Sequence, residues 1–581
     1  MAGGWALTTT TETFDPGSGA LRATPPTPSP ALRVLALGAV VLVAALGLLL
    51  RLWALGRWPV SSDEAIVGLM AKEILQGHFF AFYWGQSYGG GEPYVVAALF
   101  GVFGRSPFVL GLTPVLLDAV AALLVWRIGR RLFSPMVGAG AALLFWVWPE
   151  TYLWESTLEY GFRWLALDCG LVVLLTALRL SDGTERPAKR VLLGWGVLGL
   201  AAGLGWWCTP EIAYYLLPAA ALLVWRLAHR RCAVRARDLA TAAGAALLGA
   251  LPWIWANVTS GFSSLASVSQ PNPSYPFFEH LKVLGVHVLP TLLGLRLRAA
   301  AGSPSAPWVF GTALGAVCYV LVLAGAVAWL VALVRRREAL VLVAFVVVFP
   351  IGFAVSPFTW FWADARYAIY LAPVASLLAV SGVGAGLRRL ARPEVSAVAL
   401  PVAAGLGLTL WAVSQLIPYT PVDLAVSPRA GWFSWQADPT GFYRQVAHTL
   451  AADGIHDAYA GYWVAYVLDL EERDHLVVTP GRRRYVRYQP YADEVAASTD
   501  PAWIFFQPAD HPVLASLTGS PLLDPGCAAQ GDPCLSPGEL EGWLALHRLS
   551  YRVVLAGYFE AVVPSGRVPA ASVLAEFGMP P

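Results

Sequence analysis

The stretch LALGAVVLVAALGLLL (residues 35–50) is apolar from end to end, and comparable runs recur along the chain as far as Trp411. Runs of about 16–25 apolar residues are long enough to cross the hydrocarbon layer of a bilayer as helices. Of the 581 residues, 57% are hydrophobic and 13% are charged, whereas soluble globular proteins average about 45–50% and about 25%. The sequence therefore predicts an α-helical polytopic membrane protein rather than a soluble globular one.

About eleven transmembrane spans are predicted from these apolar runs. Their approximate limits are 34–55, 107–126, 135–149, 161–178, 191–207, 211–226, 239–256, 308–334, 340–356, 367–387 and 395–415. The first run is not expected to be a cleaved signal peptide, because it has no small-residue cleavage site and continues into Arg51 and Trp53.

Basic residues in alternate loops predict the orientation of the chain. The loops in question are RIGRR (127–131), RLSDGTERPAKR (179–190), RLAHRRCAVRARD (226–238), RRRE (335–338) and RRLARPE (388–394). The positive-inside rule places these loops and the N-terminus in the cytoplasm. An odd number of spans then places the chain after about residue 416 outside the cytoplasm. We expect a multi-pass plasma-membrane protein.

Three regions are predicted along the chain. Residues 1–30, rich in Thr, Pro, Gly and Ala, are expected to be a disordered cytoplasmic tail. Residues 31–415 form the transmembrane module, and residues 416–581 change to a mixed α/β pattern typical of a small exported domain. In that domain HLVVTP (475–480), AWIFFQP (502–508) and YRVVLAGYFEAVVP (551–564) are typical of strands.

Two helices are predicted in the same domain. One runs from a cap at Asp438 to Gly454, and the other opens with Ser536, Pro537 and Glu539, the spacing of a capping box. Cys527 and Cys534 flank a Gly/Pro-rich loop. An oxidising compartment permits a disulfide between them, and the sequence leaves this pairing open.

Two adjacent carboxylates follow the first span, in SSDEAIVGLMAKEILQG (61–77). Ser61-x-x-Glu64 is a capping box followed by apolar residues at helical spacing, so an amphipathic helix is predicted along the outer membrane surface. Glu64 then has a structural role at the start of the helix. Asp63 has no such role and is the better candidate for chemistry.

Other charged and aromatic residues gather in the predicted outer loops. FFAFYWGQSYGGGEPYV (79–95) carries Tyr88 and Glu92 among interfacial aromatic residues. PETYLWESTLEYGFRW (149–164) holds Glu155, Glu159 and Arg163 four residues apart, a spacing that predicts one helical face. FTWFWADARYAIYLAP (358–373) brings Asp364, Arg366 and Tyr367 to the start of a late span. An ionisable group at such a depth is a candidate functional residue. Asp118 and Asp168, within predicted spans, are equally compatible with polar contacts between helices.

Three motifs carry a resemblance to a known family. They are the Asp-Glu-Ala sequence after the first span, FYWGQSYGGGEPY (82–94) and ARYAIYLAP (365–373). In these residues, spread over roughly 30–400, the chain resembles the C-type (GT-C) membrane glycosyltransferases that use polyprenyl-phosphate sugars. That superfamily includes the protein O-mannosyltransferases and the lipid A aminoarabinose transferases. The Trp-Trp-Asp motif of oligosaccharyltransferases is absent, and WWCTPE (206–211) only looks similar.

The resemblance implies a GT-C catalytic module with juxtamembrane helices in the first outer loop and a cavity facing outward. It implies inverting transfer of a sugar to a hydroxyl of a glycan, lipid or protein, with Asp63 as general base beside Glu64. The donor phosphate would be held by Arg366 and Arg163, then Lys72 and Lys282. The remaining predicted cavity residues are Glu92, Glu155, Glu159, Tyr88, Asp364 and Tyr367.

The resemblance also bears on cofactors and partners. The sequence assigns no cofactor and leaves metal dependence open: some relatives bind a divalent metal, for which Asp63, His78, Glu92 and Glu155 are the candidate ligands, although their spacing is not diagnostic. Polyprenyl-phosphate sugar, an acceptor and membrane lipid are the expected partners, and no nucleic acid is expected. Two alternatives stay open: a transporter or flippase of lipid-linked sugars, and a non-catalytic scaffold of the cell envelope.

Overall fold

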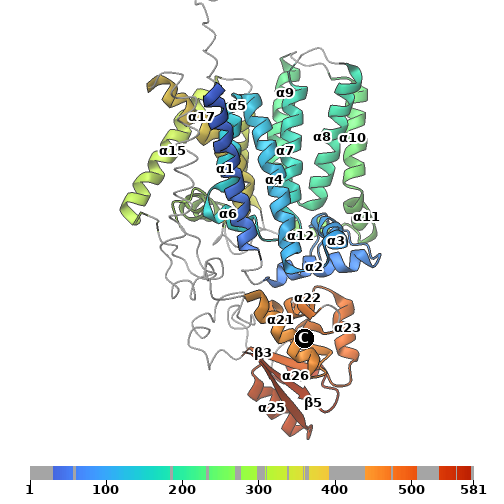
Figure 1. The fold of residues 1–581 in the computed structure, drawn as a ribbon. Helices are drawn as coiled ribbons and strands as arrows, with labels where there is room; N and C mark the ends of the chain where they lie inside the picture. Colours follow the sequence, from blue (N-terminus) through green and yellow to red (C-terminus); the bar gives the residue numbers. More distant parts are fainter. Residues whose placement is uncertain are drawn as a thin grey trace, which may run out of the picture.

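A computed structural model gives the fold as a helical bundle with a smaller α/β domain at one end (Figure 1). It describes residues 30–55, 60–182, 187–229, 234–268, 276–296, 308, 310–335, 339–356, 359, 365–390, 439–472, 475–506, 535–557 and 559–577.

The bundle is built from long apolar helices. They are α1 (Pro30–Ala54), α4 (Pro107–Leu132), α5 (Pro135–Val147), α7 (Arg163–Leu180), α8 (Ala188–Cys208), η1 (Pro210–Ile212) leading into α9 (Ala213–Ala228), α10 (Ala236–Gly249), α11 (Leu251–Thr259), α15 (Thr312–Val334), α16 (Leu340–Val355) and η4 (Arg366–Leu371) leading into α17 (Ala372–Leu390). Each predicted span from 34–55 to 367–387 overlaps one of these helices or, for 239–256, the pair α10–α11. The span predicted at 395–415 lies outside the described residues.

By length and composition, six helices of the described chain are able to cross a membrane, and α10–α11, bent by 62°, makes a seventh if the pair counts as one span. The helices α5 and α16 are apolar but shorter. The α-helical membrane fold is therefore confirmed, while the number of eleven spans stays a prediction.

Polar and small residues join the helices of the bundle. The buried guanidinium of Arg51 on α1 donates from Nη2 to Asp118 of α4 at 2.5 Å and from Nε to Ser156 at 2.8 Å. Tyr152 of α6 (Glu150–Glu155) donates to the other Asp118 oxygen at 2.9 Å. The role of Asp118 as a contact between helices is thereby confirmed. Gly199 lets α8 and α10 approach closely, because a Cβ there would lie 2.0 Å from the carbonyl of Ala242.

Several shorter helices lie at the end of the bundle that faces the α/β domain. They are α2 (Ser62–Leu75), α3 (Glu92–Phe103), α6, α12 (Ser263–Val268), α13 (Phe277–Val283), η2 (Leu284–Val288) and α14 (Leu289–Leu292). Figure 1 shows α2 and α3 between the bundle and the α/β domain. The capping box at Ser61 and Glu64 is confirmed at the start of α2.

The α/β domain has a five-stranded sheet in the order β2-β1-β3-β5-β4. Its strands are β1 (Asp457–Ala460), β2 (Val477–Pro480), β3 (Ala502–Phe506), β4 (Tyr551–Ala556) and β5 (Phe559–Pro564). β1 pairs in parallel with β2 and β3, whereas β5 is antiparallel to β3 and β4. The helices are α21 (Pro439–Ala452), α22 (Tyr462–Glu472), η5 (Arg483–Tyr485), α23 (Gln489–Ala497), α25 (Pro537–Leu546) and α26 (Ala570–Glu576).

The predicted strands and both predicted helices of this domain are confirmed. The Ser536–Glu539 capping box is formed. The central strand β1 and the helix α22 were not predicted, because DAYA (457–460) is too short to show a period. Cys527 and Cys534 lie outside the described residues, so their disulfide stays a prediction.

The α/β domain packs directly on α2. Ser62 Oγ donates to the carbonyl of Tyr462 at 2.5 Å, and Trp84 stacks on Tyr488 with ring centroids 4.0 Å apart and planes 6° apart. Residues on nearly every face of α2 are buried as a result. The predicted juxtamembrane helix is thus present in the first outer loop, and α22 packs on it.

Candidate active site

Asp63 lies in the first turn of α2, where α22 approaches the helix. Its Oδ1 accepts a hydrogen bond from the Tyr462 hydroxyl at 2.6 Å, and its backbone carbonyl accepts one from the Tyr83 hydroxyl at 2.9 Å. The side chain of Asp63 is only partly buried. One carboxylate oxygen is thus held by a neighbouring domain while the group keeps access to solvent.

Tyr462 is a fixed donor in this contact. Burial, and then the charge of Asp63, raise the pKa of Tyr462 well above its ordinary value, so its hydroxyl stays protonated. The guanidinium carbon of Arg487 lies 5.3 Å from the centroid of the Tyr462 ring, and its Nη1 donates to the carbonyl of Gly85 at 3.4 Å. Tyr462 and Arg487 of the α/β domain therefore both contact the first outer loop, at Asp63 and at Gly85.

Glu64 points the other way, into the protein. Its Oε2 accepts from the backbone nitrogen and hydroxyl of Ser61 at 3.0 and 2.9 Å, and its Oε1 accepts from the backbone nitrogen of Glu159 at 3.3 Å. Burial raises the pKa of this carboxyl to about 7, although the bonds from Ser61 favour the charged form. Glu64 therefore fixes the start of α2 against the loop before α7.

Glu92 and Glu159 form a buried pair of carboxyls beside Glu64. Glu92 Oε1 accepts from the backbone nitrogen of Leu165 at 2.7 Å, and Glu159 Oε1 accepts from that of Gly161 at 2.7 Å. Burial, and then the neighbouring Glu92, raise the pKa of Glu159 well above its ordinary value. The pair fixes the start of α3 to the start of α7.

Arg163 and Arg366 both lie close to the aromatic ring of Tyr160, at the same end of the bundle. The guanidinium carbon of Arg163 lies 4.6 Å from the ring centroid of Phe162 and 5.1 Å from those of Tyr160 and Tyr367. That of Arg366 lies 4.9 Å from the centroid of Tyr160. Arg163 is buried and interacts most strongly with the carboxylate of Glu211. Two planar cations thus flank one aromatic ring, an arrangement suited to a phosphate group.

Comparisons with known proteins support the resemblance. Residues 91–255 match the family described as dolichyl-phosphate-mannose-protein mannosyltransferase. Undecaprenyl phosphate-alpha-4-amino-4-deoxy-L-arabinose arabinosyl transferases of Pseudomonas aeruginosa are 34% identical over 157 residues (strain LESB58) and 31% identical over 166 residues (strain UCBPP-PA14). Each alignment covers 26% of this chain and 27% of the relative, so it spans about a quarter of either protein.

The fold match is far more extensive. The crystal structure of ArnT from Cupriavidus metallidurans bound to undecaprenyl phosphate superposes with a TM-score of 0.55 at 14% identity, covering 91% of this chain and 98% of that one. Its apo form gives 0.54 at 15% identity, covering 93% and 99%. The chain therefore has the GT-C fold of these structures. The predicted fold class and the predicted resemblance are thereby confirmed.

The other predicted site residues of this chain do not all lie together. Tyr88 packs edge-on against Phe162, with centroids 5.0 Å apart, and so adjoins the Arg163 cluster. Lys72 instead donates to the Tyr491 hydroxyl of the α/β domain at 3.4 Å, and exposed Lys282 pairs with Glu279 at 3.2 Å. Asp364 lies outside the described residues.

The predicted helical face of Glu155, Glu159 and Arg163 is wrong. The helix α6 ends at Glu155 and α7 begins at Arg163, and the residues between them are not helical. Gly161 in this connection has a φ of +84°, a conformation that ends the helical path. The three residues are all buried, but they do not share one helical face.

A metal site among the named ligands is not supported by this GT-C structure. Among the residues that the structure describes, no three His, Cys, Asp or Glu side chains are grouped to hold a metal ion. His78 bonds to Glu73 at 2.8 Å, and Glu92 is engaged by the backbone of α7. These donors do not converge with Asp63, so no catalytic step is derived through a metal.

Proposed function

We propose that this GT-C protein is an inverting glycosyltransferase that moves a sugar from a polyprenyl-phosphate donor to an acceptor hydroxyl. The observation that carries the proposal is the partly exposed Asp63 carboxylate, held by Tyr462 in the first outer loop. The printed names of the relatives and the undecaprenyl phosphate bound to ArnT favour a polyprenyl-phosphate donor. The basic loops favour a reaction on the outer face of the membrane.

The proposed reaction is a single displacement. The Asp63 carboxylate takes the proton of the acceptor hydroxyl. At the same time the oxygen of that hydroxyl forms a bond to the anomeric carbon of the donor sugar. The bond from that carbon to the phosphate oxygen breaks at the same time, and its electron pair leaves with the polyprenyl phosphate. Arg163 and Arg366 stabilise the negative charge that develops on this phosphate. Attack from the face opposite the leaving group inverts the anomeric configuration.

Two features of the structure favour an enzyme over a transporter or a scaffold. The buried Asp118, which a transporter would use along its path, is neutralised by Arg51 and bonded to Tyr152. A scaffold needs no solvent-accessible carboxylate at Asp63, whereas this side chain stays partly exposed although one of its oxygens accepts a hydrogen bond from Tyr462. Both features favour the enzyme.

Sugar transfer by the purified, reconstituted protein tests the proposal. The donors are a panel of polyprenyl-phosphate hexoses and pentoses, and the acceptor is a cell-envelope extract. We expect Asp63→Asn to lower transfer at least about a hundredfold, while Glu73→Gln on the same helix leaves it near the wild-type rate. Transfer that survives in Asp63→Asn contradicts the assigned base. Movement of lipid-linked sugar between leaflets without consumption of donor favours the transporter.

A further inference from the structure

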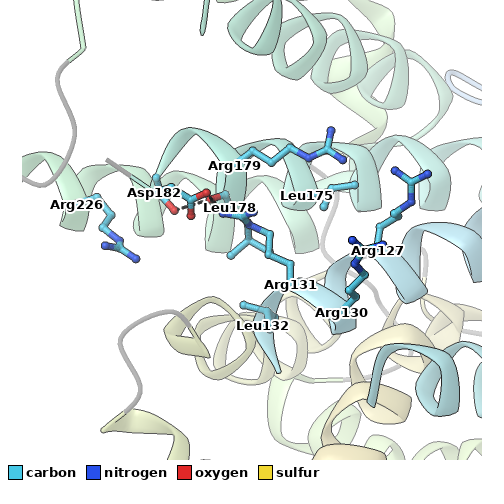
Figure 2. Close-up of a pocket in the computed structure, with 10 residues that line it drawn as sticks. Arg127, Arg130, Arg131, Leu132, Leu175, Leu178, Arg179, Asp182 and Arg226 are labelled. Atoms are coloured by element: carbon cyan, nitrogen blue, oxygen red, sulfur yellow. Dashed lines mark hydrogen bonds and ion pairs between the residues drawn. The ribbon is translucent and has the colours of Figure 1, made fainter. Parts of the chain in front are cut away.

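A cavity of about 400 Å³ lies at the end of the bundle opposite the α/β domain (Figures 1 and 2). Five of its lining residues are arginines, contributed by the last turns of three helices: Arg127, Arg130 and Arg131 of α4, Arg179 of α7 and Arg226 of α9. The other lining residues are Leu132, Leu175, Leu178, Ser181 and Asp182. We call this set the arginine pocket.

The charge of the arginine pocket is strongly unbalanced. Among the residues that the structure describes, Asp182 is the one carboxylate that lines the pocket, and it forms an ion pair with Arg131 (Figure 2). Arg131 also donates to the carbonyl of Leu178 at 3.3 Å, so this arginine binds a backbone oxygen in the last turn of α7. The C-terminal ends of α4, α7 and α9 contribute partial negative charge, which offsets only part of the positive charge of five guanidinium groups. The pocket is therefore complementary to an anion.

Arg226 gives an independent indication of a ligand. Its side chain is 7% exposed, and its Nε has no hydrogen-bond partner among the residues that the structure describes. A buried guanidinium nitrogen without a partner carries a desolvation cost that an anion in the cavity would remove. The positive-inside rule explains basic residues in these loops, but it explains neither their convergence on one cavity nor the burial of Arg226.

The position of the pocket indicates the class of ligand. It lies at the ends of apolar helices, where lipid headgroups meet the protein, and leucines line it together with the arginines. Guanidinium groups bind phosphate oxygens through two parallel N–H donors, and basic pockets between transmembrane helices bind anionic headgroups. We propose that the arginine pocket binds the phosphate of an anionic phospholipid headgroup. This inference is independent of the proposed reaction, whose residues lie at the other end of the bundle.

Lipid-dependent thermal stability of the full-length protein tests this inference. The protein, in a neutral detergent, is titrated with phosphatidylglycerol, with phosphatidylcholine and with inorganic phosphate while its Tm is measured. We expect a saturable rise of Tm with phosphatidylglycerol alone. A rise of equal size with inorganic phosphate would overturn the assignment to a lipid, and a rise of equal size with phosphatidylcholine, or none with any of the three, would overturn the anion site.

Matched arginine variants locate the effect. We expect Arg226→Gln and the exposed Arg130→Gln to move the phosphatidylglycerol midpoint at least about tenfold higher, because each removes donors from the phosphate. Arg190→Gln, an exposed arginine at the start of α8 outside the pocket, should keep the wild-type midpoint. If Arg226→Gln does not fold, Arg130→Gln alone decides. Equal midpoints in Arg130→Gln and wild type, or an equal shift in Arg190→Gln, would overturn the proposal.

Discussion

The hydroxyl of Tyr462 donates to Oδ1 of Asp63 across 2.6 Å, although the two residues are 399 positions apart in the chain. The bond crosses from α22 of the α/β domain to α2 of the first outer loop. Ser62 adds a second bond, to the carbonyl of the same tyrosine. The carboxylate proposed as the base is thus oriented by a domain that lies outside the membrane module.

Replacing Tyr462 by Phe should lower the rate of transfer without unfolding the protein. The ring and its contacts remain, while the bond that orients the Asp63 carboxylate is lost. We expect kcat to fall by about tenfold, since one hydrogen bond to a charged group is worth about 1.5–3 kcal/mol, and KM for the donor to change little. Steady-state kinetics of Tyr462→Phe and the wild type measure kcat and KM, and a thermal melt of both proteins measures Tm.

The double variant Asp63→Asn/Tyr462→Phe distinguishes orientation of the base from a general effect on folding. If Tyr462 acts through Asp63, its replacement should change little once the carboxylate has been removed. Tyr459→Phe, in the same domain, is the matched control and should leave kcat unchanged. A multiplicative loss in the double variant would show that Tyr462 acts on something other than Asp63.

The stacked pair Trp84 and Tyr488 should control the docking of the α/β domain. Trp84 is buried, and its loss leaves a cavity between the first outer loop and the α/β domain. We expect Trp84→Ala to lower Tm and to speed amide hydrogen exchange in both α2 and α22. Leu546→Ala, at a side chain 81% exposed in the same domain, should leave both unchanged. Faster exchange confined to α2 would contradict docking through this pair.

Glu64 should make stability depend on pH. Its pKa is about 7 in the folded protein against 4.5 ordinarily, so the folded state holds the proton more tightly than the unfolded chain. Its contribution to the free energy of unfolding is therefore fully present below about pH 4.5 and is lost as the pH rises through about 7. The loss is on the order of 3 kcal/mol.

The variant Glu64→Gln tests this dependence. A glutamine at this position preserves the capping box, but it cannot ionise. We expect the Tm of the wild type to fall between pH 5 and pH 8 and that of Glu64→Gln to change less. Equal slopes in the two proteins would show that another group is responsible.

Local signals allowed much of the fold to be predicted from sequence. The Ser61–Glu64 and Ser536–Glu539 capping boxes depend on neighbours three residues apart, and both form as predicted. The apolar runs mark helices because membrane solvation acts on every residue of a span. Asp63 was separated from Glu64 on the same local grounds, and the structure places the two carboxyls toward different surroundings.

Contacts between distant segments could not be predicted in this way. Tyr462 is one of 21 tyrosines, and nothing near it in sequence indicates that α22 packs on α2. The same packing helps to bury residues on nearly every face of α2, which the sequence of this helix alone does not indicate. The four-residue spacing of Glu155, Glu159 and Arg163 suggested one helix, whereas α6 ends at Glu155 and Gly161 has a non-helical backbone before α7 begins at Arg163. In each case tertiary packing or one backbone conformation overrides a local pattern.

The two arginines beside Tyr160 should distinguish phosphate binding from general positive charge. Lysine keeps the charge but lacks the planar fork that binds two phosphate oxygens. We expect Arg163→Lys and Arg366→Lys each to lower kcat/KM for the donor by about tenfold or more. Lys282→Gln, which removes a charge at a 68% exposed side chain paired with Glu279, should leave kcat/KM unchanged. Full activity in both lysine variants would show that the guanidinium geometry is not used. A loss in Lys282→Gln equal to theirs would instead return Lys282 to the donor site.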